Sequence, residues 1–172
     1  PHETRIREPE MVFYQPTPAR VILELIELMP IAPDDIFYDL GSGLGQVCIL
    51  VHLLTGARTR GVEFETAYCD YARESAQHLN LTRVEFVNAD ARAANYTDGT
   101  IFFMYTPFKG ALMESVLQKI ESASRRRAIR VCAYGECGSQ VSKQAWLELA
   151  AQRRESEDAL AIFERNPVKE QP

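Results

Sequence analysis

YDLGSGLGQV, residues 38–47, places three glycines within five positions, directly after a short apolar run. The run Ile36–Leu40 predicts a buried strand, and the apolar segment Gln46–Gly56 predicts a buried helix. Glycines between a strand and a helix permit positive φ angles, and they let a ligand approach the N–H groups at the helix start. The stretch therefore predicts an α/β fold with a ligand site at the carboxyl end of its first strand.

Strands and helices alternate through most of the chain. An amphipathic helix is predicted to begin at Thr17-Pro18, with a capping hydroxyl followed by a proline, and to end before Pro30. The same periodicities predict further helices at 66–79 and around 112–120, and further strands at 59–64, 84–88, 100–105 and 128–134. This alternation predicts a mostly parallel sheet with helices on both faces.

The C-terminal part breaks this rhythm. Trp146–Gln152 and Ala159–Arg165 are short apolar runs. The stretch RRESEDA, which runs from Arg153 to the first residue of the second run, leaves no room for a full helix between them. We expect a hairpin whose last strand is antiparallel, which completes a Rossmann-like, seven-stranded, mostly parallel sheet. One helix over Gln140–Arg153 is the competing interpretation, because periodicity is ambiguous in short apolar runs.

Length and composition bound the class of protein. The 172 residues favour one domain, residues 14–172, preceded by a polar arm of residues 1–13, and the first residue, Pro1, indicates a processed or shortened chain. A formal net charge of -5 argues against a nucleic-acid partner. The sequence contains no apolar run of about 18 residues, so we expect no membrane partner.

Four cysteines indicate a reducing, cytoplasmic location. Cys48, Cys69 and Cys132 lie in apolar patterns and are interpreted as small buried side chains, whereas Cys137 lies in a loop and is a candidate free thiol. The chain has no C-x-x-C pair, and we expect no metal site.

The glycine spacing distinguishes two cofactor classes. A dinucleotide turn reads G-x-G-x-x-G and cradles a pyrophosphate, but here Gly41, Ser42 and Gly43 are followed by a third glycine, Gly45, one residue early. The carboxylate of Asp39 would repel a pyrophosphate and attract an ammonium group. Both features favour S-adenosylmethionine (SAM), which carries an amine and no phosphate.

The next two strands deliver groups that suit a nucleoside. Glu63 ends the second strand 22 positions after Gly41, where a carboxylate can accept hydrogen bonds from two ribose hydroxyls. Phe64 can pack against the adenine ring. After the third strand, Asp90 can accept a hydrogen bond from the adenine amino group, and the backbone of Ala91 can face the ring edge.

The fourth strand ends in MYTPF, residues 104–108, where a methyl acceptor would meet the cofactor. Tyr105 can bind the amino-acid part of SAM or orient the acceptor, and it is the one candidate catalytic residue. YGECG, residues 134–138, is a second candidate lining of the acceptor pocket. Methyl transfer from a sulfonium mainly needs alignment and exclusion of water, so an obvious acid or base is not required.

From about Tyr14 to Ala133 the chain resembles a class I SAM-dependent methyltransferase. Asp39-Leu-Gly-Ser-Gly-Leu-Gly matches the first motif of that superfamily, Glu63 the second, Asp90 the third and MYTPF the fourth. Within it, DLGSGLGQV followed by GVE and Tyr71-Ala72 resembles the non-SET histone-lysine methyltransferases, the disruptor-of-telomeric-silencing class. The resemblance implies SAM as the cofactor and S-adenosylhomocysteine (SAH) as the product.

This class carries a Y-x-x-T stretch in a loop that covers the cofactor, and YQPT supplies Tyr14 and Thr17 at a matching place. The resemblance also implies a cofactor contact for Gln46. The class ends its fourth strand in Asn-Asn, where this chain has Met104-Tyr105, and methyltransferases of nucleobase amines need Asn or Asp there. Neither lysine nor nucleobase methylation therefore carries over.

We expect a SAM-dependent methyltransferase whose acceptor is a protein side chain or a small molecule. A SAM-binding or scaffold protein without catalysis is the alternative, and an NAD(P)-dependent oxidoreductase is a distant third. Transfer of a labelled methyl group separates the first two, and stabilisation by NAD instead of SAM would indicate the third.

Overall fold

One sheet of seven strands, ordered β3-β2-β1-β4-β5-β7-β6, organises the computed structural model, which describes residues 1–125, 127–154 and 158–165. Five strands pair in parallel: β1 (Ile36–Leu40), β2 (Arg58–Glu63), β3 (Val84–Asn88), β4 (Ile101–Tyr105) and β5 (Ile129–Tyr134). The remaining two pair antiparallel, β7 (Ala159–Arg165) with β5, and β6 (Glu148–Arg154) with β7. The predicted mixed sheet with an antiparallel last strand is confirmed.

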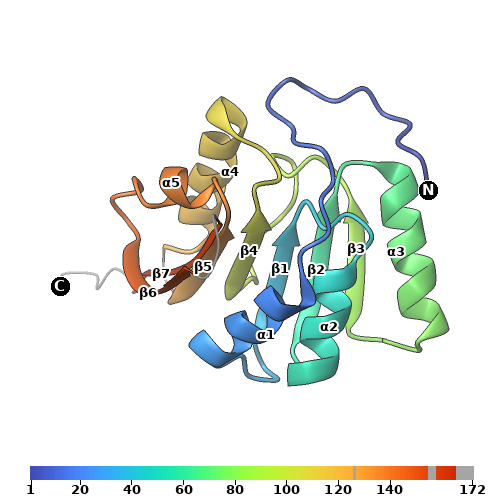
Figure 1. Cartoon of the computed structure of the whole chain (residues 1–172), viewed down its shortest axis with the longest axis horizontal. Helices are drawn as coiled ribbons and strands as arrows, with labels where there is room; N and C mark the ends of the chain where they lie inside the picture. Colours follow the sequence, from blue (N-terminus) through green and yellow to red (C-terminus); the bar gives the residue numbers. More distant parts are fainter. Residues whose placement is uncertain (126, 155–157, 166–172) are drawn as a thin grey trace.

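Helices cover both faces of the sheet (Figure 1). Apolar side chains on one face pack against α1 (Ala19–Leu28), α2 (Gln46–Thr55) and α3 (Thr66–His78). Those on the other face pack against α4 (Gly110–Ala123) and the short α5 (Gly138–Val141). Side chains alternate between faces along a strand, so Phe37 packs toward α1 and α2, whereas Tyr38 packs toward α4. No helix in the described ranges is both long and apolar enough to cross a bilayer.

The start of α1 differs from the prediction. The N-cap is Pro18, and its carbonyl accepts the first helical hydrogen bond from the N–H of Val21 at 2.9 Å. No side chain caps this helix, so the predicted capping role of the Thr17 hydroxyl is wrong. Thr17 is instead buried, and it lines the cleft described below.

The C-terminal hairpin forms, and the competing helix over Gln140–Arg153 is wrong. Strand β6 covers Glu148–Arg154, two residues later than predicted at each end, because its register with β7 and an irregularity between Leu149 and Ala151 set the pairing. The predicted connection RRESEDA lies partly outside the described residues. All four cysteines are free and buried, including Cys137, which immediately precedes α5.

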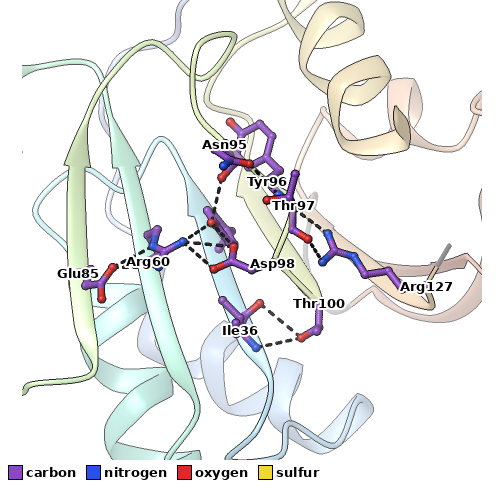
Figure 2. A network of polar contacts seen from close by, with 10 residues as sticks. Ile36, Arg60, Glu85, Asn95, Tyr96, Thr97, Asp98, Thr100 and Arg127 are labelled. Carbon is purple, nitrogen blue, oxygen red and sulfur yellow. Dashed lines mark hydrogen bonds and ion pairs between the residues drawn. The ribbon is translucent and has the colours of Figure 1, made fainter. Parts of the chain in front are cut away.

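Residues 89–100 connect β3 to β4 without a helix, and a polar network fixes them instead. Arg60 forms ion pairs with Glu85 at 3.0 Å and with Asp98 at 3.1 Å. Figure 2 shows its side chain between these two carboxylates. The hydroxyl of Tyr38 donates to Asp98 at 2.7 Å, and the guanidinium of Arg127 donates to two carbonyls of the same loop. Burial, together with the hydrogen bond to Asp98, raises the pKa of Tyr38 to about 12. The network holds the loop that contributes Asp90 to the cleft.

Candidate active site

The carboxyl ends of β1, β2, β3 and β4 surround a cleft, as expected for an open parallel sheet. Of the thirteen residues that the sequence assigned to a cofactor, eleven line this cleft: Tyr14, Thr17, Asp39, Gly41, Ser42, Gln46, Glu63, Phe64, Asp90, Ala91 and Tyr105. The other two, Gly43 and Gly45, are not among the lining residues but have positive φ angles that shape the turn. Segments far apart in the chain are therefore brought to one place.

The three glycines of the turn all have positive φ, and each permits a different close approach. A Cβ on Gly41 would lie 2.4 Å from Pro107, and a Cβ on Gly43 would lie 2.1 Å from the ring of Tyr14. A Cβ on Gly45 would lie 2.5 Å from the ring of Phe86, which packs beneath the turn. The absence of a side chain at the first two glycines thus lets side chains from the walls of the cleft pack against the turn. The absence of one at the third lets the turn pack against a strand of the sheet.

Glu63 holds the turn in place from the end of β2. Its two carboxylate oxygens accept hydrogen bonds of 2.7 Å, one from the N–H of Gly43 and one from the N–H of Glu65. Burial raises the pKa of Glu63, while these backbone hydrogen bonds act in the opposite direction. A carboxylate oxygen has two acceptor positions, so each can still accept a hydrogen bond from a ligand hydroxyl.

Asp39 is a buried acidic side chain of the cleft. Its side chain is 3% exposed, and it makes no hydrogen bond to any described residue. Burial, followed by the charge of Glu63, raises the pKa of Asp39 to about 8. The hydroxyl of Ser42, in the glycine turn, is also buried and has no hydrogen-bond partner among the described residues. Because an unpaired buried carboxylate is destabilising, this end of the cleft suits a ligand that carries a positive charge.

The β3 end of the cleft is set by Asp90 and Ala91. Asp90 accepts hydrogen bonds of 2.8 Å from the N–H of Arg92 and 3.0 Å from its guanidinium, and these bonds hold the pKa of Asp90 below its usual value. An adenine amino group would therefore compete with Arg92 for this carboxylate. The carbonyl of Ala91 accepts from Tyr96 at 2.7 Å, whereas its N–H has no partner in the described part of the chain. This N–H is therefore an available hydrogen-bond donor at the edge of the cleft.

The N-terminal arm forms one wall of the cleft, which the sequence did not reveal. Figure 1 shows residues 1–13 crossing the carboxyl ends of the strands, from α3 to α4. Glu65 accepts hydrogen bonds from the N–H and hydroxyl of Thr4 and from the N–H of Arg5, at 2.6–2.8 Å. At the other end, Glu10 accepts from the first N–H groups of α4 at 2.9 and 3.0 Å.

The arm places five side chains in the cleft that sequence reasoning missed: Glu3, Arg7, Met11, Val12 and Phe13. An irregular segment has no periodicity from which to infer its contacts, so only the tertiary structure assigns it this position. Glu65, Tyr68, Thr106, Pro107, Phe108 and Leu112 also line the cleft.

The end of β4, where the sequence predicts the acceptor, lines the cleft through Tyr105. The ring of Tyr105 packs against that of Tyr134, with 4.6 Å between their centroids, and burial raises the pKa of Tyr105. In the stretch YGECG, the residues Gly135, Glu136 and Gly138 line a neighbouring groove instead of this cleft. The described residues contain no group of three His, Cys, Asp or Glu side chains that could hold a metal ion.

Comparisons with known proteins agree with this geometry. Residues 11–123, more than half of the chain, match the family model of the histone methylation protein DOT1. No curated protein sequence gives a significant match.

Solved methyltransferases share the fold at low sequence identity. An RNA methyltransferase from Salinibacter ruber, bound to SAH, superposes with a TM-score of 0.74 at 24% identity, over 92% of this chain and 97% of its own. A precorrin-6y C5,15-methyltransferase from Geobacter metallireducens superposes with a TM-score of 0.64 at 14% identity, over 86% of this chain and 88% of its own. A geranyl diphosphate C-methyltransferase from Streptomyces coelicolor superposes with a TM-score of 0.66 at 12% identity, over 87% of this chain and 77% of its own.

The fold is thus shared by methyltransferases with unrelated acceptors, and the family match covers residues 11–13 at the end of the arm, the glycine turn and the four strands whose ends surround the cleft. The chain belongs to the DOT1 family of SAM-dependent methyltransferases.

Proposed function

We propose that this protein binds SAM along the strand order of its sheet and transfers the methyl group to an acceptor that approaches over β4. The methionine part lies at β1 beside Asp39, the ribose at β2 beside Glu63, and the adenine at β3 beside Asp90. Because β4 flanks β1 on the side away from β2, the sulfonium faces β4. Tyr105, at the end of β4, is then the candidate residue beside the methyl group.

The state of Asp39 is the observation that carries this proposal. Asp39 is a buried carboxyl group with a raised pKa and no partner among the described residues, and a cation beside it would favour its ionised form. SAM brings such a cation, its ammonium group. A pyrophosphate in the same position would place like charges together. The site therefore favours SAM over a nicotinamide dinucleotide.

We propose a protein side chain or a small molecule as the acceptor. The acidic side chains that line the cleft are Glu3, Asp39, Glu63, Glu65 and Asp90, and the basic side chain among the described lining residues is Arg7. This acidic lining, together with a net charge of -5, disfavours a polyanionic acceptor. Four free thiols fit a reducing, cytoplasmic location.

The chemical step is an in-line displacement. A lone pair of the acceptor forms a bond to the methyl carbon while the carbon–sulfur bond breaks, and SAH leaves with the bonding electrons. A neutral amine acceptor afterwards loses a proton to solvent. The chain contributes alignment, the ammonium anchor at Asp39 and the closed wall of the arm, which limits water in the cleft.

Two measurements test this proposal. Calorimetry should show that SAM and SAH bind, that NAD does not, and that Asp39→Asn weakens SAM binding at least tenfold. Asp34→Asn is the matched control, because Asp34 is exposed in the turn before β1. Incubation with methyl-labelled SAM and a fractionated lysate should then place label in protein or small molecules.

The outcomes separate the alternatives. Label in nucleic acid would overturn the proposed acceptor class, and binding without any transfer would favour a scaffold. Stabilisation by NAD but not by SAM would overturn the proposed function as a whole.

A further inference from the structure

Thr106 has an unusual backbone conformation at the place where an acceptor would meet the cofactor. It directly follows β4, and its φ of 36° lies in the left-handed region. A β-branched residue rarely adopts this conformation, because its side chain crowds the backbone. The other non-glycine residue in this region among those described, Asn80 with φ 55°, follows α3, where Asn is common.

The loop after β5 holds Thr106 in this conformation. The Thr106 hydroxyl donates to the carbonyl of Tyr134 at 3.3 Å and accepts from the N–H of Cys137 at 3.2 Å. The N–H of Thr106 donates to the sulfur of Cys137 at 3.4 Å. A Cβ on Gly135 would lie 2.9 Å from the Thr106 hydroxyl, so the glycine leaves the space in this loop that the hydroxyl fills. Strain of this kind persists where the surroundings determine the conformation, and it is concentrated at functional sites.

The residues on either side of Thr106 contact three other parts of the site. Pro107 packs on the glycine turn at Gly41, and its carbonyl accepts a hydrogen bond of 3.0 Å from the N–H of Val12 in the arm. Tyr105 packs on Tyr134. The conformation of one residue therefore sets where the end of β4 stands relative to the turn, the arm and β5.

We propose that Thr106 is a positioning residue for methyl transfer, and that Cys137 and Tyr134 hold it so that Tyr105 and Pro107 face the methyl group. The inference rests on the proposed function, because the strand order places the sulfonium toward β4. Cys137 acts here through its hydrogen bonds, as a buried thiol that makes no disulfide.

The test compares two ligands that differ only near the methyl position. SAH lacks the methyl group, whereas sinefungin carries an amine-bearing carbon in place of the methylated sulfonium. Thr106→Val keeps the shape of the side chain but removes the hydroxyl, and Thr106→Ser keeps the hydroxyl. Calorimetry should show that Thr106→Val weakens sinefungin binding about tenfold, that SAH binding stays within about twofold, and that Thr106→Ser restores sinefungin binding.

A second pair of variants protects the test if Thr106→Val does not fold. Cys137→Ala removes the sulfur that accepts a hydrogen bond from the N–H of Thr106. This variant should lower the affinity for sinefungin relative to that for SAH, as Thr106→Val does, whereas Cys137→Ser should lower this ratio less. Equal weakening of both ligands would show that Thr106 has only a structural role, and an unchanged ratio would likewise overturn the inference. Absence of SAH binding in the unmodified protein would instead overturn the proposed function.

Discussion

The carboxylate of Glu63 accepts a hydrogen bond of 2.7 Å from the backbone N–H of Gly43, which lies 20 residues earlier in the chain. This bond joins the end of β2 to the glycine turn, so the residue that would bind the ribose also fixes the loop that would bind the methionine part. The second oxygen of the same carboxylate accepts from the N–H of Glu65, the residue that anchors the arm. The turn, the second strand and the arm are therefore coupled through one side chain.

Replacing Glu63 should affect both binding and stability. Glu63→Ala leaves the N–H groups of Gly43 and Glu65 buried without partners, at a cost of about 1–3 kcal/mol each, and it removes the ribose acceptor. We expect loss of measurable SAM binding by calorimetry and a lower midpoint of urea unfolding. Glu74→Gln, at an exposed position of α3, is the matched control. Tight SAM binding by Glu63→Ala would contradict the assignment of this residue.

Asp39 should make stability depend on pH in the absence of cofactor. Its pKa of about 8 in the folded protein lies above the ordinary aspartate value near 4, so the folded state retains a proton that the unfolded state has released between those values. The free energy of unfolding should therefore fall as the pH rises from about 4 to about 8, with a slope of up to about 1.4 kcal/mol per pH unit.

Asp39→Asn removes this titration, and urea unfolding at pH 5, 6, 7 and 8 should show a flatter profile, with the variant more stable than the unmodified protein at pH 8. Burial also raises the pKa of Glu63, so part of the slope should remain. Asp34→Asn should keep the original profile, since Asp34 is exposed. An unchanged slope in Asp39→Asn would show that this carboxyl group is already ionised in the folded protein.

Gly43 and Tyr14 should be energetically coupled. Gly43→Ala places a methyl group 2.1 Å from the Tyr14 ring, at a φ of 50° that itself disfavours alanine by about 1–2 kcal/mol. In the background Tyr14→Ala, the clash disappears and only the backbone term remains. A double-mutant cycle on urea unfolding should therefore give a coupling energy of about 1 kcal/mol. Additive effects would mean that the ring does not lie on the turn in solution.

The arm should control how long the cofactor stays bound. Deleting residues 1–8 removes the hydrogen bonds from Thr4 and Arg5 to Glu65 and the ion pair between Glu8 and Arg92. We expect SAH to dissociate about tenfold faster in stopped-flow fluorescence, because one wall of the cleft is lost, while the unfolding midpoint changes little.

Thr4→Val provides a milder version of the same test, since it removes only the hydroxyl that donates to Glu65. Burial would raise the pKa of Glu65, but the hydrogen bonds from Thr4, Arg5 and Ala67 lower it to about 2, so this anchor should persist throughout the neutral range. Unchanged dissociation of SAH from both variants would show that the arm is not part of the site.

Local patterns predicted the elements of the fold closely. Strands β1, β3 and β7 have the predicted bounds, because a short apolar run between turn residues has few alternatives. The apolar pattern was less informative where strand pairing decides the ends of a strand. Strand β6 begins at Glu148, because its pairing with β7 begins there. The N-cap of α1 is Pro18 and not the predicted Thr17, whose side chain lines the cleft instead of capping the helix. Local sequence does not reveal this, because the position of Thr17 depends on packing in the cleft.

The sequence by itself determined the order of strands and helices, the glycine turn, and the carboxylates at the ends of the first three strands. These features depend on residue type and local spacing. Only the tertiary structure decided that the arm forms a wall of the cleft and that the guanidinium of Arg92 donates a hydrogen bond to the carboxylate of Asp90. It also decided that Cys137 and Tyr134 hold Thr106 in a strained conformation. Such contacts join segments far apart in the chain, and their geometry arises only when the sheet brings the strand ends together.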